Sequence, residues 1–171
     1  MDTTKSYIKI HDIDADGAED FEFEYDVTSS DLLSDLVPNR DNWGGVSWLE
    51  LDEYEYSLRQ KQINVSLDTH WESPVEWLRN ATLGTHYLSN KLVTMTTIQQ
   101  DETCVRGVAI MDGEVLQNKY IFEMTSEEVG KHYSDDEPDY NLDTLDNTIW
   151  DSIAKFVNVC EQFYLEKEEK K

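Results

Sequence analysis

Two short runs in which apolar and polar residues alternate constrain the fold of this chain more than any other feature. In Phe21–Val27 every second residue is apolar and the residues between are acidic, and Gln62–Trp71 alternates in a similar way. Successive side chains of a β-strand point to opposite faces of the sheet, so a period of two predicts half-buried strands. We therefore expect an antiparallel sheet as the main element of the fold.

Turn signals indicate how these strands are connected. Two Asp-Gly pairs, Asp16-Gly17 and Asp112-Gly113, favour the two-residue turns of β-hairpins, because glycine accepts a positive φ without steric cost. The first pair places Phe21–Val27 in an N-terminal hairpin. We expect strands over the following segments: Tyr7–Asp14, Phe21–Val27, Trp48–Tyr56, Gln62–Trp71, Lys91–Gln99, Val105–Met111 and Val115–Met124.

Helix signals mark two short segments between the strands. Ser29-Ser30-Asp31 precedes an apolar stretch, Leu32–Val37, that a proline ends. Ser73-Pro74-Val75-Glu76 has the form of a capping box with proline at the first helical position. It predicts a helix from Pro74 to about Leu83, with Gly84 just beyond its C-terminus.

The last part of the chain predicts a long amphipathic helix. Its apolar residues recur at spacings of three and four, which place them on one face of a helix. An acidic, loop-like stretch at residues 125–141 precedes this helix, and a charged, frayed end at residues 166–171 follows it. The residues of the apolar stripe are Leu142, Leu145, Ile149, Ile153, Phe156, Cys160 and Phe163.

Length and aromatic content favour a single folded domain. The chain has 171 residues, enough for one domain with its own core, and includes five Trp, nine Tyr and five Phe. Disorder goes with few aromatic residues, so most of the chain is expected to fold despite its charge. We expect one α+β domain over residues 1–171, with two helices packed on an antiparallel sheet and a long C-terminal helix.

The charge balance is strongly acidic. Aspartate and glutamate total 37 residues against 14 lysines and arginines, which gives a formal net charge of −23. Nucleic-acid backbones and anionic membranes carry the same sign and are disfavoured as direct partners, whereas a basic protein surface is favoured. The alternative is that the charge serves only solubility.

The sequence shows no signal for secretion or membrane insertion. The N-terminal stretch MDTTKSYIKI lacks the apolar core of a signal peptide, and no window approaches 18 continuous apolar residues. We therefore expect a cytoplasmic protein, in which Cys104 and Cys160 are buried free thiols.

No motif in the sequence predicts catalysis or a cofactor. Asp12–Gly17 resembles the start of a calcium-binding EF-hand loop, but Phe23 occupies the position that requires a bidentate glutamate. The four histidines, His11 among them, show no metal-ligand spacing, and phosphate-binding loops and nucleophile motifs are missing. We expect no enzyme activity, no metal and no cofactor.

Acidic rows form the remaining candidate site. On a strand, Glu22, Glu24 and Asp26 would project from one face about 6.6 Å apart, because a strand rises roughly 3.3 Å per residue. Such a row of carboxylates on a rigid sheet resembles a phosphate backbone and suits a basic cleft that binds nucleic acid. Two more clusters are expected in this partner-binding surface: Glu50, Asp52, Glu53 and Glu55, and Asp135, Asp136, Glu137 and Asp139.

Three stretches of the chain have a distinctive pattern: Arg40–Trp48, Ile63–Pro74 with its T-x-W-x-x-P ending, and Val105-Arg106-Gly107 before a turn. Together they resemble the YubB-like family of phage and plasmid proteins. The resemblance covers about Asp41 to Asn118, and the chain departs from the family at Gly45-Val46-Ser47, where members tend to carry T-K. The resemblance implies a ferredoxin-like core with split β-α-β connectivity and a mobile-element origin, and it brings no catalytic residues.

These features predict a small acidic accessory protein of a phage-type element that binds and inhibits a host protein. The expected target is a nucleic-acid-binding defence factor, whose basic surface the carboxylate-rich faces would occupy as a mimic of DNA. The alternative is a structural domain that self-associates, for example as a homodimer, with its charge used only for solubility.

Overall fold

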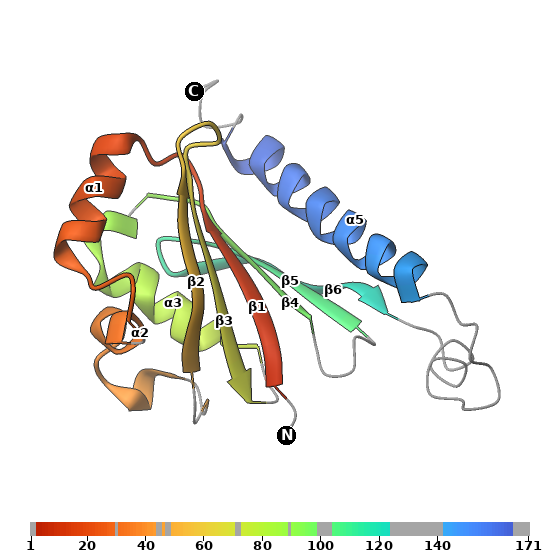
Figure 1. Cartoon of the computed structure of the whole chain (residues 1–171), viewed down its shortest axis with the longest axis horizontal. Helices are drawn as coiled ribbons and strands as arrows, with labels where there is room; N and C mark the ends of the chain where they lie inside the picture. Colours follow the sequence, from red (N-terminus) through yellow and green to blue (C-terminus); the bar gives the residue numbers. More distant parts are fainter. Residues whose placement is uncertain are drawn as a thin grey trace.

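The protein folds around a six-stranded antiparallel sheet with helices on both faces (Figure 1). The α+β class and the antiparallel sheet expected from the sequence are confirmed. The fold is that of a computed structural model, which describes residues 3–29, 31–43, 46, 49–70, 73–88, 90–98, 104–123 and 142–165.

The described residues contain six strands and four α-helices. The strands follow the order β2-β3-β1-β4-β5-β6 across the sheet, and every neighbouring pair is antiparallel. The strands are β1 (Thr3–Ile10), β2 (Leu49–Ser57), β3 (Gln62–His70), β4 (Val93–Ile98), β5 (Cys104–Met111) and β6 (Glu114–Glu123). The helices are α1 (Ala15–Glu24), α2 (Asp31–Leu36), α3 (Val75–Gly84) and α5 (Leu142–Cys160), with 3₁₀ turns at Arg40–Trp43 and His86–Leu88 and a π-helical turn at Glu161–Leu165.

The N-terminal strand β1 lies inside the sheet, between β3 and β4. Ile8 at its centre pairs with Val65 of β3 on one side and with Met95 of β4 on the other. The chain passes from β1 to the edge strand β2 through α1 and α2, and from β3 to β4 through α3. Each of these two connections therefore skips one strand.

One face of the sheet is covered by α1, α2 and α3, which lie together on the same side in Figure 1. Trp77 of α3 is 2% exposed, and its Nε1 donates a hydrogen bond to the backbone oxygen of Leu33 at 3.2 Å. Phe21 of α1 stacks on Tyr54 of β2 with ring centroids 6.2 Å apart. Burying a large apolar side chain stabilises the fold by about 1.5–3 kcal/mol, so these contacts hold the helices on the sheet.

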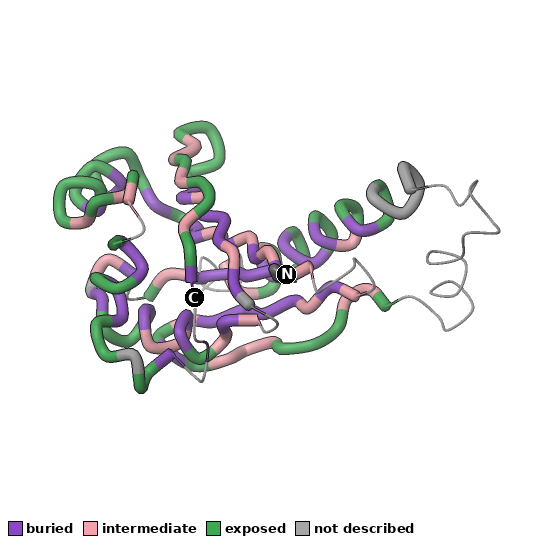
Figure 2. The backbone as a smooth tube through the Cα atoms, turned by 60° about the horizontal axis from the view of Figure 1, so that its bottom comes forward, coloured by how far each residue is buried: buried purple, intermediate pink, exposed green. Residues whose placement is uncertain are grey.

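The opposite face of the sheet is packed against α5. Figure 2 shows the buried side of this helix turned towards the strands and its exposed side turned outwards. The predicted apolar stripe is confirmed where it is described, except for Phe163, which is 57% exposed in the π-helical turn. The side chains of Leu142 and Leu145 lie outside the described part. The buried members of the stripe are Ile149, Ile153, Phe156 and Cys160.

Gly107 of β5 allows α5 to approach the sheet closely. A Cβ atom at this position would lie 2.9 Å from Cζ of Phe156 and 2.9 Å from Cγ2 of Ile121. We expect Gly107→Ala to lower the free energy of unfolding by about 1–3 kcal/mol in urea denaturation, because the helix must move away. Gly84→Ala is the control, since a Cβ there meets Leu36 O at an ordinary 3.8 Å. Equal losses in the two variants would contradict the close-packing argument.

The predicted N-terminal hairpin is wrong, because its turn and the residues Phe21–Glu24 of its second strand lie in helix α1, which ends before Tyr25. Asp14 is the N-cap of this helix, and its Oδ1 accepts a hydrogen bond from the backbone nitrogen of Gly17 at 2.7 Å. An aspartate here satisfies one of the amides that a helix N-terminus leaves free. The predicted strand row of Glu22, Glu24 and Asp26 is therefore wrong as well.

The segment Phe21–Val27 carries two periods at once. Besides the alternation, Ala18, Phe21 and Tyr25 follow one another at spacings of three and four, as in a helix. Ala18 and Phe21 are buried and Tyr25 is half-buried, whereas Phe23, which fits only the strand period, is 91% exposed. The helical period agrees with the structure, because a helix places Ala18, Phe21 and Tyr25 against the core.

The capping box predicted at Ser73 does not form. Helix α3 begins at Val75, and Pro74 occupies the N-cap position without a side-chain hydrogen bond. The Ser73 hydroxyl instead hydrogen-bonds Oγ1 of Thr97 at 2.8 Å, and Thr97 also contacts Oγ of Ser6 at 2.9 Å. The serine thus joins the loop before α3 to the sheet.

Most other predicted elements are confirmed within a few residues. Asp112 and Gly113 have φ angles of 51° and 76°, which is the turn conformation that an Asp-Gly pair favours. The two cysteines are thiols; Cys160 is buried as expected, whereas Cys104 is only half-buried. The predicted acidic loop at 125–141 and the charged end at 166–171 lie outside the described residues. None of the described helices combines the length and apolar character needed to span a membrane.

Candidate functional site

A strongly acidic surface surrounds helix α1. Between Lys9 and Arg40 the chain has no lysine or arginine. The acidic side chains in this interval are all exposed and, with Phe23, are called here the α1 surface. Its acidic members are Asp12, Asp14, Asp16, Glu19, Asp20, Glu22, Glu24, Asp26, Asp31 and Asp35.

Phe23 is the most exposed large apolar side chain of the described residues, at 91%. A helix turns about 100° per residue, so Phe23 points away from Phe21, which faces the core. Glu19 and Asp20 lie one helical turn before Phe23, on the same side of α1. The α1 surface therefore presents an aromatic ring within a field of carboxylates.

The placement of acids along α1 is not the arrangement that favours the helix. Carboxylates stabilise a helix near its N-terminus, as Asp14 and Asp16 do, and are unfavourable near its C-terminus. Glu22 and Glu24 lie at that C-terminal end, and no basic residue occupies its last turn. Glu24 also lies near the hydroxyl of Tyr87. Burial raises the pKa of Tyr87, and the negative charge of Glu24 raises it further. The acids at this end thus cost stability locally.

The second predicted cluster lies on β2, which is an edge strand of the sheet. Glu50, Asp52, Glu53 and Glu55 are all exposed, but an irregularity between Leu51 and Glu53 interrupts the pairing register. The β2 acids therefore do not form the regular row that two-residue spacing along a strand would produce.

Asp52 is already paired within the protein. Its Oδ2 lies 2.8 Å from Nζ of Lys5 and accepts a hydrogen bond from Oγ of Ser66 at 3.2 Å. The hydrogen bond from Lys5 holds the pKa of Asp52 below its usual value. Glu50, Glu53 and Glu55 are the other exposed acids of this strand.

A hollow of about 460 Å³ lies between acids of the β2 cluster and the segment that follows α1. It is lined by Val27 and Thr28, which follow α1, and by residues 51–55 of β2. Asp26 accepts a hydrogen bond from the Thr28 hydroxyl at 2.8 Å, next to this hollow. The third cluster, Asp135, Asp136, Glu137 and Asp139, lies outside the described residues.

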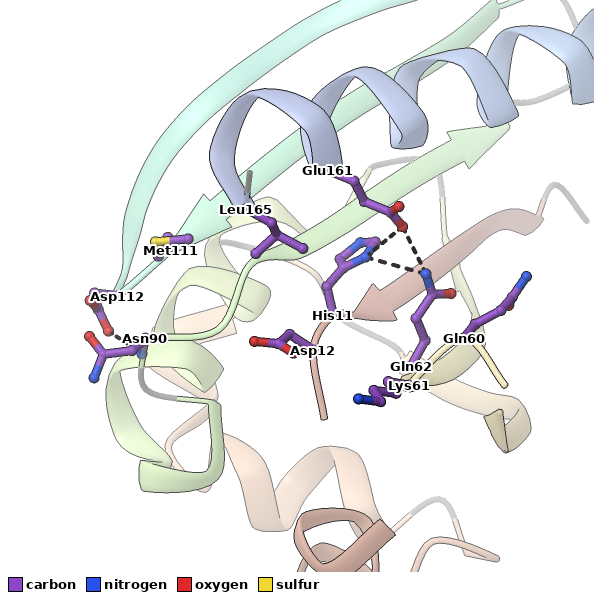
Figure 3. A pocket seen from close by; sticks show the side chains of 10 residues that line it. All are labelled: His11, Asp12, Gln60, Lys61, Gln62, Asn90, Met111, Asp112, Glu161 and Leu165. Carbon is purple, nitrogen blue, oxygen red and sulfur yellow. Dashed lines mark hydrogen bonds and ion pairs between the residues drawn. The ribbon is translucent and has the colours of Figure 1, made fainter. Parts of the chain in front are cut away.

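A buried polar network that the sequence did not indicate lies under the end of α5 (Figure 3). His11 is 1% exposed; its Nδ1 lies 3.0 Å from Oε1 of Glu161 and its Nε2 lies 2.9 Å from Oγ1 of Thr94. Gln62 donates from Nε2 to the same oxygen of Glu161 at 2.8 Å. These contacts join the residue that follows β1 to strands β3 and β4 and to the turn that follows α5.

Burial keeps His11 neutral. Loss of solvation, aided by the positive charge of Lys9, lowers the pKa of His11 to about 4. Because an ionised carboxylate only accepts, we assign the ring proton to Nδ1, which lies against Glu161, and Nε2 then accepts from the Thr94 hydroxyl. The 3.5 Å contact between Gln62 Nε2 and Nδ1 then joins two donors and is not a productive hydrogen bond.

The order carboxylate, histidine, hydroxyl is also that of a catalytic triad. Thr94, however, is 1% exposed, so its hydroxyl is not accessible to a substrate. The arrangement therefore ties the end of α5 to the sheet. No local sequence pattern predicts it, because Glu161 and His11 lie at opposite ends of the chain.

A cavity of about 550 Å³ opens beside this network (Figure 3). Turns of the sheet meet here, and Asp12, Lys61, Asn90 and Asp112 on its rim all have positive φ. Lys91 donates to the backbone oxygen of Asp12 at 2.6 Å, which holds the rim together. In the described part of the chain, no group of three or more histidine, cysteine, aspartate or glutamate residues is arranged to hold a metal ion.

Comparison with known proteins places this chain in no group: no family model, curated protein or solved structure matches it. The resemblance to the YubB-like family stays a prediction.

Proposed function

We propose that this protein binds a basic surface of another protein through the α1 surface, with Phe23 as the apolar anchor. The observation that carries the proposal is the 91% exposure of Phe23 among exposed carboxylates. Aromatic residues dominate the energetics of protein interfaces, and complementary charge speeds association and selects partners. A target whose basic surface binds nucleic acid would be inhibited by this contact.

Two features of the α1 surface favour binding over solubility alone. Solubility gains nothing from an exposed phenylalanine, which adds apolar area to water. It also gains nothing from placing Glu24 at the helix end that this carboxylate destabilises. A basic partner would remove both costs, because it would cover the ring and neutralise the carboxylates.

We also propose a ferredoxin-like core made of β1 to β4 with α1 and α3. The strand order β2-β3-β1-β4 and the two connections that each skip one strand support this assignment. In this arrangement α5, β5 and β6 are additions to the core, and the α1 surface lies on one of the two connecting helices.

The second candidate function is self-association through α5. Two apolar side chains one helical turn apart, on α5 and its following turn, support it: Val159 and Phe163 are 53% and 57% exposed. Contacts of this kind are insensitive to salt, unlike those of the α1 surface. Sedimentation in high salt therefore separates the two functions.

The main proposal is tested by affinity capture from an extract of the source cells. We expect a basic protein to bind the immobilised chain, to elute as the salt concentration rises, and to be displaced by duplex DNA. Phe23→Ala should weaken its binding about tenfold or more, which corresponds to about 1.4 kcal/mol. The double variant Glu22→Lys with Glu24→Lys should abolish retention.

Matched variants control for exposure and for net charge. Leu58→Ala removes an apolar side chain that is 68% exposed on the β2–β3 turn, and it should leave binding unchanged. Glu114→Lys with Glu123→Lys makes the same change in net charge on the opposite edge strand, β6. Equal loss in both double variants, or full binding by Phe23→Ala, would refute the role of the α1 surface.

A further inference from the structure

A groove runs between α5 and strands β1–β3, on the sheet face opposite α1. Two cavities of about 140 and 460 Å³ share Lys9, Trp150 and Ile153. The cavity beside the His11 network lies next to the larger one, because Gln62 and Glu161 line both. The two cavities of about 140 and 460 Å³ are together called the α5 groove, and the residues that matter for its chemistry are Tyr7, Glu53, Glu55, Gln62, Trp150 and Glu161.

One end of the α5 groove combines aromatic and acidic side chains. Trp150 is 45% exposed and packs edge-on against Tyr7, with ring centroids 5.0 Å apart. Glu53 and Glu55 line the same cavity from β2. An indole face beside carboxylates is the surface on which proteins hold ammonium and guanidinium groups.

The other end of the groove has a buried acceptor without a donor. The side chain of Gln62 is 8% exposed, and its Oε1 has no hydrogen-bond partner. In Figure 3 this oxygen points away from His11, towards Gln60, which also lines the groove. An unpaired buried acceptor is unfavourable, so a ligand that carries N–H donors would satisfy it.

The groove favours a positively charged occupant even though Lys9 lines it. Lys9 is engaged, because its Nζ donates to Oδ1 of Asn64 at 2.8 Å, and burial lowers the pKa of its ammonium group. Against this one cation the groove carries the carboxylates of Glu53, Glu55 and Glu161. The groove therefore suits a positively charged occupant.

We propose that the α5 groove binds an extended segment of a partner protein that carries arginine or lysine side chains. One cationic side chain lies on Trp150 beside Glu53 and Glu55, and another donates to Gln62 and Glu161. The distance from Trp150 to Glu161 along the helix is about 16 Å, at 1.5 Å per residue. An extended chain of about five residues spans it. This site is separate from the α1 surface and does not depend on it.

The probe for this site is a fluorescently labelled peptide of alternating arginine and glycine, titrated with the protein at about 0.15 M salt. Fluorescence anisotropy should report saturable binding. Trp150→Ala should weaken it about tenfold, and the double variant Glu53→Gln with Glu55→Gln should weaken it by a similar factor. A peptide of alternating glutamate and glycine should not bind.

The matched control is the double variant Glu19→Gln with Glu22→Gln, which makes the same change in net charge on the α1 surface. It should change the affinity less than about twofold, because the α1 surface lies on the other face of the sheet. Phe23→Ala should have no effect, so this test and that of the α1 surface succeed or fail separately. Equal weakening by the two glutamine pairs, or unchanged binding by Trp150→Ala with an unaltered melting temperature, would overturn the proposal.

Discussion

Replacing Trp77 by alanine is expected to lower the free energy of unfolding by about 3–5 kcal/mol. The indole is 2% exposed between α3 and the other helices of its layer. Its removal opens a cavity and also leaves the backbone oxygen of Leu33 without the hydrogen bond that Nε1 donates. This is a large fraction of the stability of a domain of this size.

Urea denaturation followed by circular dichroism measures this loss. Trp150→Ala is the matched control, because it removes the same ring from a position that is 45% exposed. We expect it to cost less than about 1 kcal/mol. Comparable losses in the two variants would show that α3 does not carry the packing described for it.

The second large effect is a dependence of stability on pH that comes from His11. The pKa of this ring is lowered from 6.5 to about 4 in the folded protein, mainly by burial. Between these values the unfolded chain binds a proton that the folded chain does not, so the free energy of unfolding falls as the pH falls. From about pH 7 to pH 5 the loss amounts to about 2 kcal/mol.

His11→Gln isolates this contribution, since glutamine keeps a donor for Glu161 and does not titrate. Between pH 7 and pH 5 the free energy of unfolding of the natural chain should fall by about 2 kcal/mol more than that of the variant. Burial raises the pKa of Glu161, which opposes the trend at lower pH, so the comparison ends at about pH 5. Parallel curves for the two proteins would contradict a buried neutral His11.

The candidate surfaces could be predicted only in part from the sequence. The acids of β2 lie on the strand where alternation and composition placed them, although an irregularity in register breaks their spacing. The acids of α1 are exposed as expected, but on a helix, which spreads them around its axis. The alternation predicts Phe23 on the apolar face of a half-buried strand, and its exposure on α1 is the observation on which the proposed function rests.

Local pattern determined several elements of this protein by itself. The alternation of β3, the stripe of Ile149, Ile153 and Phe156 on α5, and the turn at Asp112 each follow from steric and hydrophobic rules that act within about a dozen residues. They agree with the structure because no competing pattern occupies the same stretch.

Only the tertiary structure decided between patterns that overlap. Phe21–Val27 fits both periods. In the structure β3 and β4 pair with both edges of β1, which leaves this segment no edge of β1 to pair with, and helix α1 buries Phe21 against Tyr54. The contact between His11 and Glu161 likewise requires α5 to cross the finished sheet. Long-range packing alone fixes such choices, since the free energy that separates them comes from residues far apart in the chain.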